Sequence, residues 1–153
     1  MNRLIPALVL LAVAANPAVA SRSYIGVDVD PHHPPSGCAF QGGGLLSEKH
    51  GFSEVTCSGQ KMIWLEYQSR VTNELRYKLK PSESLLDQML CGYKDERHYE
   101  GHLWAVGTWV DEDGGNGKAT SVRLAWRVEI DYGGFKIERV PPELIACSVE
   151  AAD

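Results

Sequence analysis

Residues 120–134 read TSVRLAWRVEIDYGG, and this stretch decides the fold. Apolar and polar side chains alternate along it almost without interruption, which indicates a β-strand with one buried and one solvated face. The side chains expected on the buried face are Val122, Leu124, Trp126, Val128, Ile130 and Tyr132. Gly133-Gly134 suits a two-residue hairpin turn, so we expect a second, antiparallel strand to follow.

The register expected for this hairpin contains one favourable and one unfavourable charge pair. Asp131 would meet Lys136, which carries the opposite charge, whereas Glu129 would oppose Glu138. We therefore predict the hairpin, and this register is its expected form.

The segments that precede the hairpin also favour strands. Residues 99–110 are rich in aromatic and β-branched side chains, so they are expected to form a partner strand and complete a C-terminal meander. Residues 61–80 alternate as well. Their length favours a hairpin that turns at Thr72-Asn73 over one long strand.

Two segments depart from this pattern. After Pro81, an apolar stripe at helical spacing predicts one short helix that ends at Gly92. Residues 30–52 contain three prolines and Gly42-Gly43-Gly44, which favours a long loop. The predicted fold class is α+β, a mostly antiparallel β-sheet with one short helix and two disulfides.

The N-terminus has the pattern of a cleavable export signal. Arg3 precedes an apolar run over 7–15, which is about half of the roughly 20 residues that span a bilayer. Ala18-Val19-Ala20 matches the small-x-small site cut by signal peptidases. We expect residues 1–20 to be removed, leaving a single periplasmic or secreted domain over 21–153 with no stable membrane anchor.

All of the cysteines follow this signal. An even number of cysteines in an oxidising compartment favours a disulfide framework. The four are Cys38, Cys57, Cys91 and Cys147, which allow three pairings. We favour Cys38–Cys57 with Cys91–Cys147, because each bond then joins a weakly patterned segment to a strongly patterned one. Bridged sulfurs also argue against a cysteine nucleophile, which needs a free thiolate.

The net charge limits the class of partner. The formal charge is −5, and removing residues 1–20, which hold Arg3 and no acidic residue, makes it −6. Because nucleic-acid-binding domains favour a basic face, nucleic acid is not the expected partner.

The candidate metal ligands are His98, Glu100 and His102. On a strand these three side chains would share one face about 6–7 Å apart, so a bent strand could form a two-histidine, one-carboxylate set for zinc. His32 or His33 could add a ligand if the N-terminal loop covers that face. A solvated start of a strand is the alternative that we favour.

Other chemistry finds less support in the sequence. The loop 111–117 resembles a calcium loop at Asp111 and Asp113, but Asn116 stands where an EF-hand requires glycine, and we favour a solvated hairpin loop. No Gly-x-Ser-x-Gly nucleophile motif occurs, and we assign no catalytic residue.

Two tryptophans are candidate binding residues, namely Trp64 and Trp104. Trp64 has the parity of the polar set Glu66, Gln68 and Arg70, which would place it on the solvated face of its strand. Exposed tryptophans often dominate the binding energy of an interface. Packing of Trp64 beneath a loop is the alternative.

Two short stretches resemble known families. The stretch RLAWRVEIDYGGFKI, from Arg123 to Ile137, resembles the final hairpin of nuclear-transport-factor-like and cystatin-like domains. Cys57-Ser58-Gly59 before a strand, with a late Cys147, is similar to small bacterial periplasmic lysozyme inhibitors. Each resemblance covers less than half of the chain, and neither assigns a family.

Taken together, these features favour a protein that is not an enzyme. We predict an exported, non-catalytic binding module with a protein partner, of the kind that acts as an inhibitor or immunity protein against an envelope or secreted enzyme. The alternative is a metal-binding protein or metal-dependent enzyme that uses the His98, Glu100 and His102 cluster.

Overall fold

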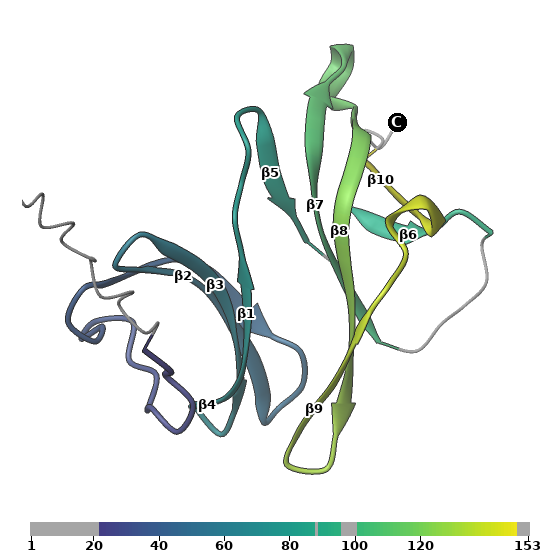
Figure 1. Ribbon diagram of the computed structural model, residues 1–153. Helices are drawn as coiled ribbons and strands as arrows, with labels where there is room; N and C mark the ends of the chain where they lie inside the picture. The colour runs from purple at the N-terminus through teal and green to yellow at the C-terminus, as the bar shows by residue number, and fades with distance from the viewer. Residues whose placement is uncertain (1–21, 88, 96–100, 150–153) are drawn as a thin grey trace, which may run out of the picture.

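A computed structural model describes residues 22–87, 89–95 and 101–149, which form two antiparallel β-sheets that pack face to face (Figure 1). The first sheet is a four-stranded meander in which each strand pairs with its neighbour in the sequence. Its strands are β1 (Cys38–Leu45), β2 (His50–Cys57), β3 (Gln60–Tyr67) and β4 (Arg70–Tyr77).

The second sheet has the order β5-β7-β8-β10-β6, and β9 also pairs with β8. Its strands are β5 (Glu83–Leu86), β6 (Cys91–Tyr93), β7 (His102–Asp111), β8 (Gly117–Asp131), β9 (Gly134–Arg139) and β10 (Ile145–Val149). Two short 3-10 turns, η1 (Asp113–Gly115) and η2 (Pro142–Leu144), join strands. The strands β7, β8 and β9 form the predicted C-terminal meander.

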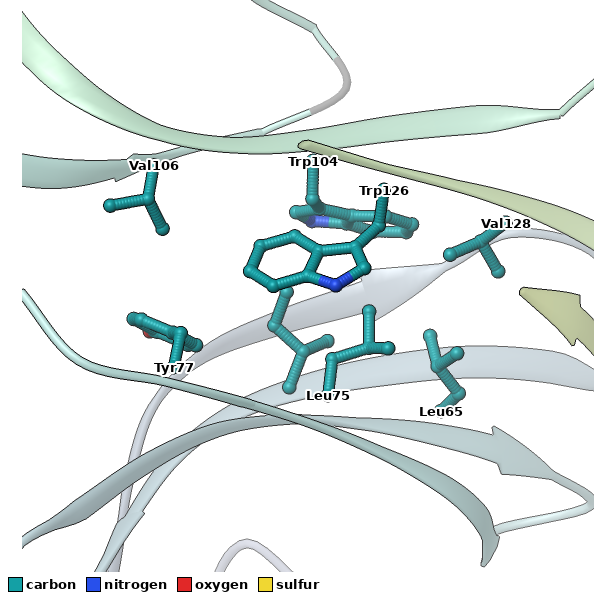
Figure 2. Close-up of a cluster of buried hydrophobic side chains, with 8 residues drawn as sticks. Leu65, Leu75, Tyr77, Trp104, Val106, Trp126 and Val128 are labelled. Atoms are coloured by element: carbon teal, nitrogen blue, oxygen red, sulfur yellow. The ribbon is translucent and has the colours of Figure 1, made fainter. Parts of the chain in front are cut away.

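The main hydrophobic core lies between the two sheets. Figure 2 shows Trp104 and Trp126 of the second sheet packed over Leu65, Leu75 and Tyr77 of the first. A fully buried side chain of this size stabilises the fold by about 1.5–3 kcal/mol. Burial of both indoles therefore fixes how the two sheets stack.

Each sheet also buries apolar side chains on its outer face. On the second sheet this outer cluster is Leu86, Leu103, Ala105, Ala125, Val140, Ile145 and Cys147. On the first sheet it is Tyr24, Val55, Cys57, Met62, Trp64 and Val71. The central strands are therefore covered on both sides, and simple alternation describes them only in part.

The disulfide pairing predicted from the sequence is confirmed. Cys38 is bonded to Cys57 and Cys91 to Cys147. Each bond joins residues that lie directly opposite each other on paired strands, β1 with β2 and β6 with β10. The bonds therefore fix the register of two strands at sheet edges.

The predicted β8–β9 hairpin is confirmed, but its register is different. Residues 132–133 form the turn, with Gly133 at a φ of 75°. Glu129 consequently lies opposite Lys136, and Glu138 lies opposite Arg127. The distance from Nη2 of Arg127 to Oε2 of Glu138 is 2.6 Å. The shift replaces the unfavourable pair of glutamates with two pairs of opposite charge.

The end of β8 is not buried as the alternation predicted. Ile130 is partly exposed and Tyr132, in the turn, is fully exposed. The hairpin therefore extends beyond the core.

The hairpin predicted for residues 61–80 is confirmed as β3 and β4, with its turn at another place. The turn is formed by Gln68 and Ser69, which both have positive φ, and not by Thr72-Asn73. This position gives two strands of eight residues each, and the Thr72 hydroxyl donates a hydrogen bond to the Leu65 carbonyl.

The helix predicted after Pro81 is wrong. Residues 83–86 form β5, and Met89, part of the expected apolar stripe, is 87% exposed. Arg123 of β8 donates two hydrogen bonds of 2.6 Å to the Glu83 carboxylate, which lowers the pKa of Glu83 to about 2. Edge pairing with β7 and this ion pair hold the segment extended.

The long loop predicted for residues 30–52 is also wrong over about half of its length, because 38–45 and 50–52 are strand. The chain is irregular up to Gly37, and β1 begins at Cys38 despite its three consecutive glycines. Pairing with β2 and the Cys38–Cys57 bond keep this segment in the sheet.

The predicted export signal, residues 1–20, lies outside the described residues. Within the ranges that the structure describes, no helix is long and apolar enough to cross a membrane.

Candidate binding groove

A groove of about 470 Å³ lies on the outer face of the first sheet, and we call it the Glu66 groove. The N-terminal segment and the β3–β4 turn form one wall, β1 forms the other, and β2 and β3 form the floor. The lining residues are Val29, Pro31, Phe40, Gln41, Gly42, Gly43, Gly44, Leu45, Phe52, Ser53, Glu66 and Ser69.

Missing side chains on β1 and β2 create the space at the floor. A Cβ atom on Gly51 would stand 3.4 Å from Oε2 of Glu66 and 3.8 Å from Cδ2 of Leu45. A Cβ atom on Gly43 would stand only 2.6 Å from the backbone oxygen of Phe52. Glycine at both positions therefore lets the strands approach closely and leaves space beside the Oε2 atom of Glu66.

The Glu66 carboxylate is the main polar group of the groove. Its Oε1 atom is shielded from solvent and has no hydrogen-bond partner among the described residues. Burial raises the pKa of Glu66, and a hydrogen bond with the Ser53 hydroxyl opposes that rise. An unpaired, shielded carboxylate oxygen is costly, so a donor that bound this carboxylate would remove part of that cost.

The walls of the groove are mainly apolar. Val29 and Pro31 come from the N-terminal segment, whereas Leu45 ends β1 and is 78% exposed. Backbone hydrogen bonds hold the N-terminal wall in place, including one of 2.7 Å from the Val29 N–H to the Ser69 carbonyl. Asp28 and Arg70 form an ion pair of 2.9 Å beside it.

The tryptophans predicted to bind a partner are both fully buried. Trp64 lies on the outer face of β3, where its ring centroid is 5.2 Å from that of Tyr24 and 5.7 Å from that of Phe40. Trp104 lies in the core between the sheets, 5.3 Å from Phe52. The expectation that Trp64 is exposed is therefore wrong, because the N-terminal segment covers the face that its parity assigned to solvent.

The proposed metal cluster falls mainly outside the described residues. His98 and Glu100 lie there, and His102 is half-buried at the start of β7, where burial lowers its pKa. His33 lies on an exposed turn, with Nδ1 2.8 Å from Oδ2 of Asp30. The structure contains no group of three or more potential metal ligands in the parts of the chain that it describes. Zinc binding stays a prediction.

The acidic loop near η1 is exposed. The Trp109 indole N–H donates a hydrogen bond of 2.9 Å to Asp111, and Glu112 pairs with Lys118. These contacts agree with the interpretation of residues 111–117 as a solvated loop.

The Glu66 groove offers few groups that could take part in a reaction. Glu66 is the one ionisable side chain among the described lining residues, and its polar neighbour is the Ser53 hydroxyl. General acid–base catalysis on a bound molecule usually uses two groups with separated pKa values. The arrangement therefore suits recognition of a ligand through one carboxylate and apolar walls.

The sequence contains a signal for this groove that its alternation pattern does not reveal. Gly42-Gly43-Gly44 was interpreted as part of a loop, and Glu66 as a member of a solvated polar set. Gly42, Gly43 and Gly44 pair with Glu54, Ser53 and Phe52 of β2, and Gly51 is the next residue along β2. Several glycines gathered on two paired strands are the pattern that leaves a hollow in a sheet.

Comparisons of the chain with protein-family models, with curated proteins and with solved structures find no match.

Proposed function

We propose that this protein is an exported, non-catalytic binding module and that the Glu66 groove is its binding site. The observation that carries the proposal is the Oε1 atom of Glu66, which lies shielded and unpaired at the floor of a preformed groove. Ligand sites are typically concave and mostly apolar, with a few polar groups that orient the ligand. The groove has that composition.

The setting of the groove supports a recognition role. Its walls are fixed by the sheet, by the Cys38–Cys57 disulfide at the start of β1 and by the backbone bonds of the N-terminal segment. Such a preorganised site loses little conformational entropy on binding.

We further propose that the protein works in the periplasm or outside the cell, as an inhibitor or immunity protein for an envelope or secreted enzyme. Two disulfides and no free cysteine in the described residues agree with an oxidising compartment. The export pattern of residues 1–20 supports the same location.

The test is affinity capture by groove variants. The exported protein, with both disulfides formed, is immobilised and exposed to a cell-envelope extract. Leu45→Trp places a bulky side chain at the exposed rim of the groove. Leu144→Trp is its matched control, because Leu144 is also an exposed leucine but lies in η2 beside the second sheet.

The proposal expects one partner to bind saturably to the wild-type protein and to Leu144→Trp, and not to Leu45→Trp. Two results would overturn it. One is the absence of any saturable partner. The other is equal capture by Leu45→Trp, provided that circular dichroism shows the variant to be folded.

A further inference from the structure

We infer that the Glu66 groove receives one positively charged side chain, a lysine or an arginine, presented by a protein partner. This inference rests on the proposed function, because it names the chemistry of the group that enters the same groove.

The Glu66 carboxylate has no cationic partner among the described residues. Oε1 of Glu66 has no hydrogen-bond partner, and no lysine or arginine of the described chain forms an ion pair with this carboxylate. Two other carboxylates with little exposed side-chain surface do have such partners: Glu74 pairs with Arg76 at 2.8 Å, and Glu83 pairs with Arg123 at 2.6 Å. A cation supplied from outside would complete at Glu66 the pairing that the chain supplies elsewhere.

The groove above the Glu66 carboxylate suits the shape of a lysine or arginine side chain. Lysine and arginine place a charged head at the end of an apolar stem. The groove offers apolar contacts from Val29, Pro31 and Leu45 above a floor that holds the carboxylate. A neutral hydrogen-bond donor could bond to the carboxylate, but it would not compensate the negative charge.

The exposed apolar rim of the groove favours a protein, and not a free amine, as the source of the cation. Leu45, on the rim, is 78% exposed. A free amine that enters the groove would leave this side chain in water, whereas a protein surface would cover it. Charged anchors surrounded by apolar contacts that exclude water are characteristic of protein interfaces. The net charge of −5 also favours a basic partner.

The test compares charged and neutral probes of the same shape. N-acetyl-arginine methylamide is titrated against the citrulline analogue, and N-acetyl-lysine methylamide against its Nε-acetylated form. Binding is followed by the NMR shifts of the backbone amides of Gly43, Gly51 and Glu66. The charged probes should bind at least about tenfold more tightly than the neutral ones, the size expected for one hydrogen bond between charged groups.

Two protein variants test whether binding of the charged probes depends on the Glu66 carboxylate. Glu66→Gln keeps the shape and removes the charge, and it should weaken the charged probes by about tenfold or more. Glu143→Gln removes an exposed carboxylate from η2 and should leave binding unchanged. Equal binding of arginine and citrulline, or unchanged binding by Glu66→Gln, would overturn the inference.

A competition step connects the probes to the protein partner. Arginine or lysine probes should displace the captured partner, and the neutral analogues should not. If Leu45→Trp abolishes capture while Glu66→Gln retains it, the groove remains the binding site and the cationic ligand is wrong. If the charged probes bind at Glu66 but no protein partner is captured, the assignment of the cation to a protein is wrong.

Discussion

The outer face of the first sheet has two different halves, one around Trp64 and one around Glu66. Both residues lie on β3. Around Trp64, side chains from the N-terminal segment and from β1 fill all the space beside the sheet. Two residues further along β3, Glu66 faces a groove. Trp64 lies opposite Ser53, and Glu66 lies opposite Gly51. The absence of a side chain at Gly51 thus separates a filled half of this face from a half that contains a groove.

The largest expected effect is on the filled half. Trp64→Ala should destabilise the protein by about 3–5 kcal/mol, because it leaves a large cavity beneath Tyr24 and Phe40. Urea unfolding followed by circular dichroism measures the change. Tyr132→Ala removes a fully exposed aromatic ring and should change the stability by less than about 0.5 kcal/mol. Similar losses for the two variants would contradict the burial of Trp64.

The next effect concerns the disulfide that holds β1. The double change Cys38→Ser and Cys57→Ser should reduce the free energy of unfolding by about 3 kcal/mol, given the sequence separation of 19 residues. β1 should also exchange its amide hydrogens faster, because it has a partner strand on one side only. Hydrogen exchange, resolved residue by residue, measures the amide protection in both halves of the face. Unchanged protection of 42–45 would show that β1 does not depend on the bond.

A smaller effect of opposite sign is expected in the hollow half. Burial raises the pKa of Glu66 above its ordinary value of 4.5, so its ionised form destabilises the folded state. That loss of stability develops as the pH rises through the raised pKa and is absent below pH 4.5. Glu66→Gln should therefore stabilise the protein at pH 7 by up to about 1 kcal/mol and have little effect at acid pH.

The control for this change is Glu143→Gln, which removes an exposed carboxylate and should be neutral at both pH values. Thermal unfolding at pH 7 and at acid pH provides the measurement. A loss of stability in Glu66→Gln at pH 7 would mean that the carboxylate stabilises the fold, and the contrast between the two halves would then fail.

The smallest effect is expected at the rim. Leu45→Ala should change the stability by less than about 0.5 kcal/mol, because the side chain is mostly exposed. The same change should weaken capture of the partner, since it removes an apolar contact from the groove wall. Parallel measurements of unfolding and of capture test this separation of stability from binding.

Much of the sheet structure could be predicted from local sequence. Alternation identified β8, because a strand with one buried face shows that face in every second residue. The aromatic and β-branched composition of residues 99–110 identified most of β7. The cysteine pairing followed from the same contrast between patterned and unpatterned segments. The helix prediction failed for β5, whose extended form depends on Arg123, a residue 40 positions away. Such a contact leaves no trace in a local pattern.

The groove was harder to predict for a related reason. The parity of Trp64 and Glu66 placed both on one face of β3, and that assignment agrees with the structure. Solvent exposure of this face was the error, because Tyr24 and the rest of the N-terminal segment fold over it. The glycines of β1 gave no alternation at all, and their role depends on the pairing of β1 with β2, which contains Gly51. Periodicity shows which side chains share one face of a strand. Whether that face is covered, and where a cavity forms, depends on segments that are distant in the sequence.

The position of β10 has a consequence for how the chain assembles. This last strand lies between β8 and β6, so β6 reaches the second sheet only through it. The second sheet therefore stays incomplete until Ile145–Val149 has paired with both β8 and β6. Pairings between segments distant in sequence form slowly, because the entropy of closing a long loop is lost before the contacts form. The pairing of β10 is thus the step that closes this sheet.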